Sequence, residues 1–379
     1  MRCIKYSLLW GVVLLVGVVC FPLKAQVHSA IERVDSLLSE GSLAEAATLI
    51  DALQEELGDK KQDALLLREI KLSFLQGDPY TALARTSALS KKFLKKEEVR
   101  SLLAALLYHS YRFEDLSTLQ EAPKGKVKSK GNGYFPKRLL EQAERAERLV
   151  ESAQLLEVVD SFTVSHLEDL RHASGLSSEV GELSFGTGTE DYRYTTALGF
   201  ETFTHRIGDD GKNHIFYVKK TASGEILEER ELEELHLPGG EYFPILRQDG
   251  QSILFASPTG AIDLDLTAQE NGDFSEGIGG LDLYMSRRDP HTGKFQVPTL
   301  LGMPFNSPSD DLILLYDDFY HVGLLVTTRF ARKGFYNCYR FVMSETAPPL
   351  PTNDYELKKK YAALRPWRLR EQRAQSIAE

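Results

Sequence analysis

The residues with the clearest capacity for chemistry are acidic and fall in two groups in the C-terminal half of the chain. The members of these groups are Asp263, Asp265 and Asp273, and then Asp310, Asp311, Asp317 and Asp318. Carboxylate oxygens at this density are the ligands that Ca²⁺ prefers, although their spacing fits no EF-hand loop. Two carboxylates about 5–10 Å apart across a cleft would instead perform acid/base hydrolysis of a glycoside.

The second acidic group also has a purely structural interpretation. Aspartate, asparagine and serine at the ends of strands commonly fix turns by accepting hydrogen bonds from nearby backbone N–H groups. We interpret four residues in this way first, namely Asn306, Ser307, Asp310 and Asp311. On this interpretation the sequence predicts no metal site at these positions.

Other catalytic patterns do not occur in the sequence. There is no Gly-x-Ser-x-Gly nucleophile elbow, no His-Glu-x-x-His and no phosphate loop. The nine histidines are dispersed, and His205 and His214, which flank a predicted turn, are interpreted as surface polar groups. We therefore expect no enzymatic activity and no cofactor.

Short apolar runs surround the acidic residues and would have to position them. The runs at 253–256, 281–285 and 323–327 are rich in aliphatic and aromatic residues, and turn formers such as Asp249-Gly250 and Gly279-Gly280 bound them. This pattern predicts an all-β meander. At Gly279 and Gly280, just before a strand, we expect that a side chain would clash or that the backbone needs a positive φ.

Stretches of this meander repeat along the chain. Leu232 matches Leu301, Asp249 matches Asp318 and Phe255 matches Leu324, all at one constant offset, while residues 216–220 resemble residues 283–287. A single hairpin cannot bury its apolar face alone, so we expect successive copies to stack their sheets.

The amino-acid sequence pattern of the repeats is similar to that of a known family. Pro244-x-Leu246-x-x-Asp249-Gly250, Phe255-Ala256-Ser257 and Gly279-Gly280-x-Asp282-Leu283-Tyr284 resemble TolB-type (WD-like) β-propeller repeats. The continuation Leu301-Gly302-x-Pro304-x-Asn306-Ser307-Pro308-x-Asp310-Asp311 resembles a variant found in envelope proteins of Gram-negative bacteria. The resemblance covers about 182–342 and implies a propeller-like fold in which the motif residues fix the repeat or contribute to binding. The motif residues are Gly279, Gly280, Asp282, Asn306, Ser307, Asp310 and Asp311.

The length of this region limits the architecture. A closed propeller needs at least about four blades of some 40–45 residues each, whereas residues 182–342 hold three or four at most. A partial propeller and a sandwich both remain open.

The N-terminal region of the chain has helical periodicity. Apolar residues recur at helical spacing over 27–122, and Gly41-x-Leu43-x-Glu45-Ala46 and Gly77-Asp78-x-Tyr80-x-Ala82-Leu83 resemble the loop and second helix of tetratricopeptide repeats. That resemblance implies a concave protein-binding surface, and the alternative is a helical bundle that only packs on the β-domain. A basic loop, a bridging helix over 137–159 and a first strand over 158–164 follow.

The two ends of the chain indicate where the protein works. Arg2 and Lys5 precede an apolar run, and Ala25 offers a small residue for cleavage, an order that is typical of a secretory signal peptide. Cys20 leaves lipidation open, although Val19 precedes it where Gly or Ala is usual. After cleavage only Cys338 would remain, and we expect it to be buried. The basic tail beyond a Pro-rich spacer would dock on a membrane surface or a partner, or fold back on the acidic body.

The sequence therefore predicts an α+β multidomain protein with an N-terminal α-helical repeat-like domain, an all-β propeller-like domain, complete or partial, and a C-terminal basic helix. The predicted segments are a signal peptide (1–25), helical domain (27–122), basic loop and bridging helix (123–181), TolB-like β-domain (182–345), and spacer with basic helical tail (346–379).

We expect a non-enzymatic, exported envelope protein, periplasmic or associated with the outer membrane, that acts as a scaffold for other envelope proteins. A net charge of −10 argues against nucleic acid as a partner, while the basic tail leaves peripheral membrane contact open. The alternative is a glycan-binding or glycan-processing protein, which requires Asp263, Asp310 and Asp318 to converge in a pocket.

Overall fold

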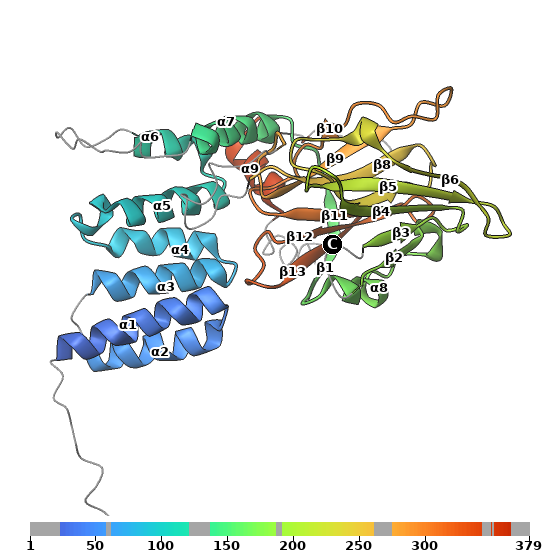
Figure 1. Ribbon diagram of the computed structural model, residues 1–379. Helices are drawn as coiled ribbons and strands as arrows, with labels where there is room; N and C mark the ends of the chain where they lie inside the picture. Colours follow the sequence, from blue (N-terminus) through green and yellow to red (C-terminus); the bar gives the residue numbers. More distant parts are fainter. Residues whose placement is uncertain are drawn as a thin grey trace, which may run out of the picture.

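A stack of helices lies beside several antiparallel sheets (Figure 1). The computed structural model describes residues 23–57, 62–120, 137–186, 192–260, 275–342, 350 and 352–364. The predicted α+β organisation, with helices first and antiparallel sheets after them, is confirmed. Among the described residues the sheets close into neither a barrel nor a propeller.

The helical stack follows the order of the chain. Its helices are α1 (Leu23–Glu40), α2 (Leu43–Leu57), α3 (Asp63–Leu75), α4 (Pro79–Arg85), α5 (Glu97–His109) and α6 (Leu116–Gln120). Each contacts the next along the chain, because each helix buries an apolar face against its neighbour. In α2, for example, Leu43, Ala46, Ile50 and Leu53 are buried.

The turn between α3 and α4 is built for a close approach to the β-domain. Asp78 caps α4 by accepting a hydrogen bond from the Thr81 N–H, and Pro79 occupies the first helical turn. Gly77 has a φ of +88°, and a Cβ there would lie 2.5 Å from the carbonyl oxygen of Phe330. Glycine is therefore required both by the backbone and by the neighbouring loop.

The β-domain consists of three sheets whose strands are mostly in sequence order. The first holds β2 (Glu182–Ser184), β3 (Arg193–Thr195), β4 (Glu201–Ile207), β5 (Asn213–Lys220) and β6 (Ile226–Glu231). The second holds β7 (Tyr242–Leu246), β8 (Ser252–Pro258), β9 (Leu281–Arg287) and β10 (Thr299–Leu300). The third holds β11 (Asp311–Asp317), β12 (Val322–Thr327), β13 (Tyr336–Val342) and β1 (Glu157–Val164).

The positions matched by the sequence repeat are equivalent in these sheets. Asp249 lies in the turn between β7 and β8, and Asp318 lies in the turn between β11 and β12. Phe255 and Leu324 lie on the second strands of their units, and both are buried. The repeat thus corresponds to a four-stranded unit.

Strand β1 completes the last sheet with a segment that precedes the other strands in the chain. The predicted strand at 158–164 is present and pairs antiparallel with β13, with Ser161 opposite Tyr339. Helix α7 (Lys137–Glu151) accordingly ends earlier than the predicted end at residue 159. Pairing with the open edge of β13 outweighs the helical propensity of these residues.

A shared core joins the helices to the β-domain. One apolar cluster combines α5, α7 and α9 (Tyr355–Ala363) with Ile278 and Met303 of the β-domain. Another combines side chains from the three sheets, including Phe203, Phe255 and Leu324. Cys338 is buried in that core, as predicted, and burial raises the pKa of its thiol to about 12.

Several predicted features fall partly or wholly outside the described residues. These are residues 1–22 of the signal peptide with Cys20, the basic loop at 123–136, the acidic Asp263, Asp265 and Asp273, and the tail at 365–379. The described segment of the tail, α9, contacts α7, and Lys359 pairs with Glu114 at 2.6 Å. None of the described helices has the length and apolar character that crossing a membrane requires.

Candidate functional site

Asp282 closes the turn that leads into β9. Its Oδ2 atom accepts hydrogen bonds from the backbone N–H groups of Ile278 and Gly279, each at 2.7 Å. The Thr259 hydroxyl donates to the same oxygen. The side chain is fully buried, and burial raises the pKa of this carboxyl to about 7. Asp282 therefore stabilises the turn before β9, and that turn covers its side chain.

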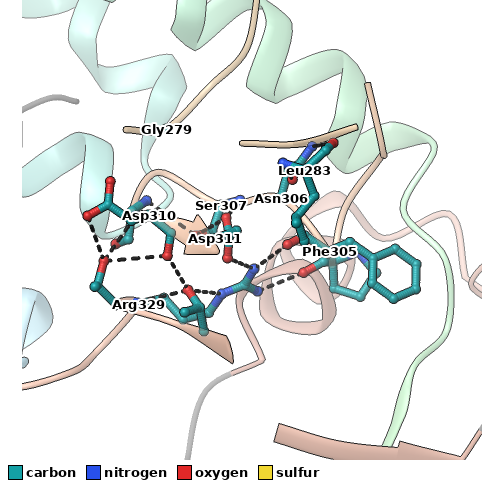
Figure 2. A network of polar contacts seen from close by, with 12 residues as sticks. Gly279, Leu283, Phe305, Asn306, Ser307, Asp310, Asp311 and Arg329 are labelled. Carbon is teal, nitrogen blue, oxygen red and sulfur yellow. Dashed lines mark hydrogen bonds and ion pairs between the residues drawn. The ribbon is translucent and has the colours of Figure 1, made fainter. Parts of the chain in front are cut away.

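Asp311 has the equivalent role in the third sheet. Its Oδ2 atom accepts hydrogen bonds from the N–H of Ser307 at 2.6 Å and from the Ser307 hydroxyl at 2.8 Å. Its Oδ1 atom receives the guanidinium of Arg329 at 2.6 Å, as Figure 2 shows. Each carboxylate thus lies at the start of its strand and fixes the residues just before it.

Asn306, whose contacts with Leu283 are drawn in Figure 2, and Asp310 connect this turn to the neighbouring sheet. The Asn306 side chain accepts a hydrogen bond from the Leu283 N–H at 2.7 Å and donates to the Leu283 carbonyl at 3.1 Å. The Asp310 carboxylate accepts from the Leu281 N–H at 3.0 Å. These two side chains therefore hold β9 of the second sheet beside the start of the third.

The two glycines of the motif lie at the same junction. A Cβ on Gly279 would lie 2.3 Å from the carbonyl oxygen of Ser309, and the Gly280 carbonyl accepts a hydrogen bond from the Thr259 N–H at 2.7 Å. Neither glycine has a positive φ. The sequence analysis gave two reasons why glycine would be needed here. The steric clash applies at Gly279, whereas neither glycine needs a positive φ.

Arg329 is the member of this network that the sequence analysis missed. Its guanidinium is fully shielded and donates to the carbonyls of Pro304 and Phe305 at 2.7 and 2.8 Å, besides Asp311. Nothing in the local sequence distinguishes it from a surface arginine, because these partners lie 18 to 25 residues earlier in the chain.

The helical stack covers this end of the sheets. Tyr108 of α5 donates a hydrogen bond to the Ile278 carbonyl at 2.6 Å, and Lys333 donates its backbone N–H to the Leu75 carbonyl at 2.8 Å. A small cavity of about 210 Å³ remains between the helices and the sheets, lined by Tyr111, Asp310 and other residues. The predicted site residues are thus brought together, but at an internal junction between turns, sheets and helices.

The acidic residues required by the glycan alternative do not converge. Asp310 and Asp318 flank opposite ends of β11, which at about 3.3 Å per residue places them roughly 25 Å apart. Asp318 pairs with Arg247 at 2.6 Å, and Asp317 accepts a hydrogen bond from the Ser177 N–H at 2.9 Å. Asp263 lies outside the described residues.

An open pocket of about 810 Å³ lies past the end of β11 that is remote from the helices. Four of its lining residues are exposed and have large apolar side chains: Leu198 (76% exposed), Phe200 (40%), Phe319 (72%) and Tyr320 (62%). They come from the β3–β4 turn and the β11–β12 turn. These residues could have been noticed in the sequence. Gly199 and Asp318 indicate exposed turns, and large apolar side chains are unusual in such turns.

Two charged residues that line the same pocket, Glu201 and Arg247, have partners within the chain. Glu201 accepts from the Tyr217 hydroxyl at 2.7 Å and pairs with Arg288 at 3.0 Å. Arg247 lies 4.5 Å from the ring centre of Tyr316. The exposed aromatic and aliphatic groups of the turns, hereafter the turn patch (Leu198, Phe200, Phe319 and Tyr320), form the apolar, solvent-exposed part of the pocket.

Comparisons with protein families, with curated proteins and with solved structures find no match for this chain.

Two histidines interpreted as surface groups are in fact buried. His205 is 0% exposed, stacks on Tyr192 with ring centres 5.4 Å apart, and accepts a hydrogen bond from the Phe243 N–H at 3.2 Å. His214 is 5% exposed and lies between Asp210 and Glu241. The surface interpretation was wrong because both rings are covered by segments distant in the sequence.

His214 also lies near His236 and Glu241, and one donor atom of each residue lies within 4.8 Å of the other two. The His214 and His236 rings are stacked with centres 4.0 Å apart. Burial lowers the pKa of His214, but its contacts with Glu241 and Asp210 outweigh that effect and raise the pKa above its ordinary value. Burial raises the pKa of Glu241.

Proposed function

We propose that this chain is a non-enzymatic, exported envelope protein that acts as a scaffold and binds other proteins through the turn patch. The turn patch is the main observation that supports this proposal. Monomeric soluble proteins rarely leave clustered apolar side chains in water, and such clusters commonly mark interaction surfaces. Here they surround an open pocket, which gives a partner both a rim and a depression to fill.

The chemistry of the patch fits a polypeptide with apolar side chains. Phe319 and Tyr320 lie edge to face with ring centres 4.9 Å apart, and both rings are mostly exposed. Aromatic side chains surrounded by polar groups are the usual anchors of protein interfaces. The neighbouring Glu201 and Arg247 are engaged within the chain, so they supply a polar rim and no free catalytic group.

The arrangement of sheets and helices supports a scaffold that consists of a partial propeller-like body and a helical-repeat arm. Three successive units of antiparallel strands follow one another, and β1, which precedes them in the chain, completes the last unit. The helices stack in chain order, as in helical-repeat arms.

The proposal is tested by crosslinking and pull-down from the native cell envelope. The variant Phe319→Ala/Tyr320→Ala removes the two aromatic anchors, and we expect it to lose the partner recovered with the unchanged chain. The matched control is Leu227→Ala/Val297→Ala, whose side chains are 61% and 83% exposed and lie outside the pocket. Equal recovery with all three proteins would refute binding through the patch.

Export is tested by N-terminal sequencing of the mature protein. Cleavage after Ala25 leaves Gln26 first, whereas a lipid-modified Cys20 would place the protein on a membrane. A mature protein that still starts at Met1 would contradict export to the envelope. The glycan alternative has less support, because its carboxylates at Asp310 and Asp318 lie at opposite ends of one strand.

A further inference from the structure

The small cavity between the helical stack and the sheets lies where four segments of the chain meet. Its volume is about 210 Å³, and it lies at the opposite end of β11 from the turn patch. Its walls come from the ends of α3 and α5, from the turn before β11 and from the loop between β12 and β13. Because an apolar cavity of about 150 Å³ holds a benzene molecule, this one has room for a ligand of roughly five to ten non-hydrogen atoms.

Four aromatic rings contribute to the walls of this cavity, in two pairs. Phe74 of α3 and His109 of α5 lie edge to face, with ring centres 5.1 Å apart. Tyr111, just after α5, and Phe330 of the β12–β13 loop have ring centres 6.5 Å apart. The face of an aromatic ring carries partial negative charge and attracts cations as well as apolar groups. The walls therefore suit a ligand that is both apolar in shape and positive in charge.

The charged residues of the lining also favour a cation. Asp310 brings a carboxylate to the wall. Two basic residues of the lining are held by other parts of the chain. The guanidinium of Arg329 is 1% exposed and pairs with Asp311, and the ammonium of Lys333 donates to the Ser39 carbonyl at 2.8 Å. Neither basic group is directed at the carboxylate of the cavity wall by these contacts.

The backbone at the cavity is held in a conformation that bulky residues rarely adopt. Tyr111 has a φ of +58° and Phe330 a φ of +52°, and they are two of five non-glycine residues with a positive φ in the described part of the chain. Strained residues of this kind cluster at ligand-binding sites. Gly77 packs so closely on Phe330 that a Cβ would lie 2.5 Å from the Phe330 carbonyl oxygen. The rings are thus fixed in advance, which lowers the entropic cost of binding a ligand.

We propose that this cavity binds a small quaternary ammonium group, with its methyl groups against the aromatic rings and its charge near Asp310. Such a group has no N–H to satisfy, so aromatic faces and a carboxylate are sufficient to recognise it. A neutral molecule of the same size gains only the apolar contacts, and the carboxylate repels an anion. A free solute such as choline and the headgroup of a choline lipid carry the same group, and the experiment below separates these two sources.

Isothermal titration of the full chain with tetramethylammonium tests the site, with neutral tert-butanol as the comparison molecule. The titration is made at pH 8, where a histidine ring ordinarily carries no charge. We expect saturable binding of one tetramethylammonium per chain, about 10-fold or more tighter than that of tert-butanol. Choline that competes for the site, in a chain that does not sediment with phosphatidylcholine vesicles, would support the proposal with a free solute as the source. Sedimentation with the vesicles that tetramethylammonium reverses would support it with a lipid headgroup as the source.

The variant Asp310→Asn removes the charge but keeps an oxygen that accepts a hydrogen bond from the Leu281 N–H. We expect it to weaken tetramethylammonium binding about 10-fold and to leave tert-butanol binding unchanged. Asp289→Asn is the matched control, since the Asp289 carboxylate also accepts backbone N–H groups, in a turn outside the cavity. It should bind tetramethylammonium as the unchanged chain does.

A second pair of variants tests the aromatic wall. Phe74→Leu keeps an apolar side chain but removes one ring face, and it should weaken tetramethylammonium binding about 3-fold or more. Phe335→Leu is its control, because Phe335 lies outside the cavity. Thermal unfolding without ligand shows whether each variant is folded. Absence of saturable tetramethylammonium binding, equal affinity for tert-butanol, or unchanged affinity in both folded cavity variants would overturn the proposal.

Discussion

The guanidinium of Arg329 lies 2.6 Å from Asp311, in an ion pair whose two side chains are 1% and 0% exposed. Arg329 follows β12 and Asp311 begins β11, so the pair joins two adjacent strands at the end that faces the helices. The guanidinium also donates from its two Nη atoms to the carbonyls of Pro304 and Phe305, and from Nε to the Thr327 hydroxyl. The buried guanidinium, through its hydrogen bonds to these groups, fixes the turn between the second and third sheets.

Removing the cation should be costly, because it leaves a buried carboxylate and two carbonyls without their partner. We expect Arg329→Met to lower the free energy of unfolding by about 3–5 kcal/mol. Urea denaturation followed by circular dichroism measures the loss. Arg332→Met is the control, since Arg332 is exposed and only lies over the Phe335 ring, and it should cost at most about 1 kcal/mol. Similar losses in both variants would contradict a special role for the buried pair.

Asp282 should make the stability depend on pH. Burial raises its pKa to about 7 in the folded chain, above the roughly 3.9 of an unfolded aspartate. The folded state therefore holds the extra proton between these values, and stability falls as the pH rises through them. From about pH 5 to pH 8 the contribution of this carboxyl falls by about 2–3 kcal/mol.

The variant Asp282→Asn isolates this contribution. Its amide oxygen still accepts the N–H groups of Ile278 and Gly279, but it does not titrate. Urea denaturation at both pH values should show a shallower loss of stability in the variant than in the unchanged chain. His214 titrates in both proteins, so its effect cancels in the difference. Parallel pH profiles would show that Asp282 stays ionised in the folded protein.

The junction at Gly279 should not tolerate a side chain. A Cβ there would lie 2.3 Å from the Ser309 carbonyl oxygen and 2.5 Å from that of Ser307, and neither backbone oxygen moves without shifting the turn. We expect Gly279→Ala to destabilise the protein by about 1–3 kcal/mol. Gly302→Ala is the control, because no atom lies within 4 Å of its Cβ position and its φ is not positive. Thermal melting of the two variants should differ by several degrees, and equal melting would argue against the close approach.

Local features of the fold could be predicted from the sequence where neighbouring residues determine them. The segment 158–164, rich in β-branched residues, predicted a strand, and the glycine at 279 predicted a close contact, because chain conformation and local sterics act over a few residues. The pairing of that strand with β13 could not be predicted, since its partner lies at the far end of the β-domain.

Clusters of side chains depend on contacts between distant segments. His214, His236 and Glu241 come together only when β5, the 3-10 helix η7 (Glu233–Leu235) and β7 are placed, and nothing in their spacing marks them as a group. Likewise, the turn patch joins Phe200 to Phe319 across two sheets. The motif residues themselves were recognisable, but their position under the helices depends on the packing of α5 and α7.

The helices and sheets should unfold as one unit, because one core contains side chains from both. Tyr108 is fully buried in that core and donates its hydroxyl hydrogen bond to the Ile278 carbonyl, next to Gly279. Tyr108→Phe keeps the ring but leaves this carbonyl without its partner, at a cost of about 1–3 kcal/mol. Tyr320→Phe, at a mostly exposed position, is the control and should change stability by less than about 0.5 kcal/mol. Far-UV circular dichroism follows the helices and near-UV circular dichroism follows the buried tyrosines, and both transitions should shift together to lower urea in Tyr108→Phe. A helical transition that shifts while the near-UV transition stays in place would show that the stack unfolds separately from the sheets.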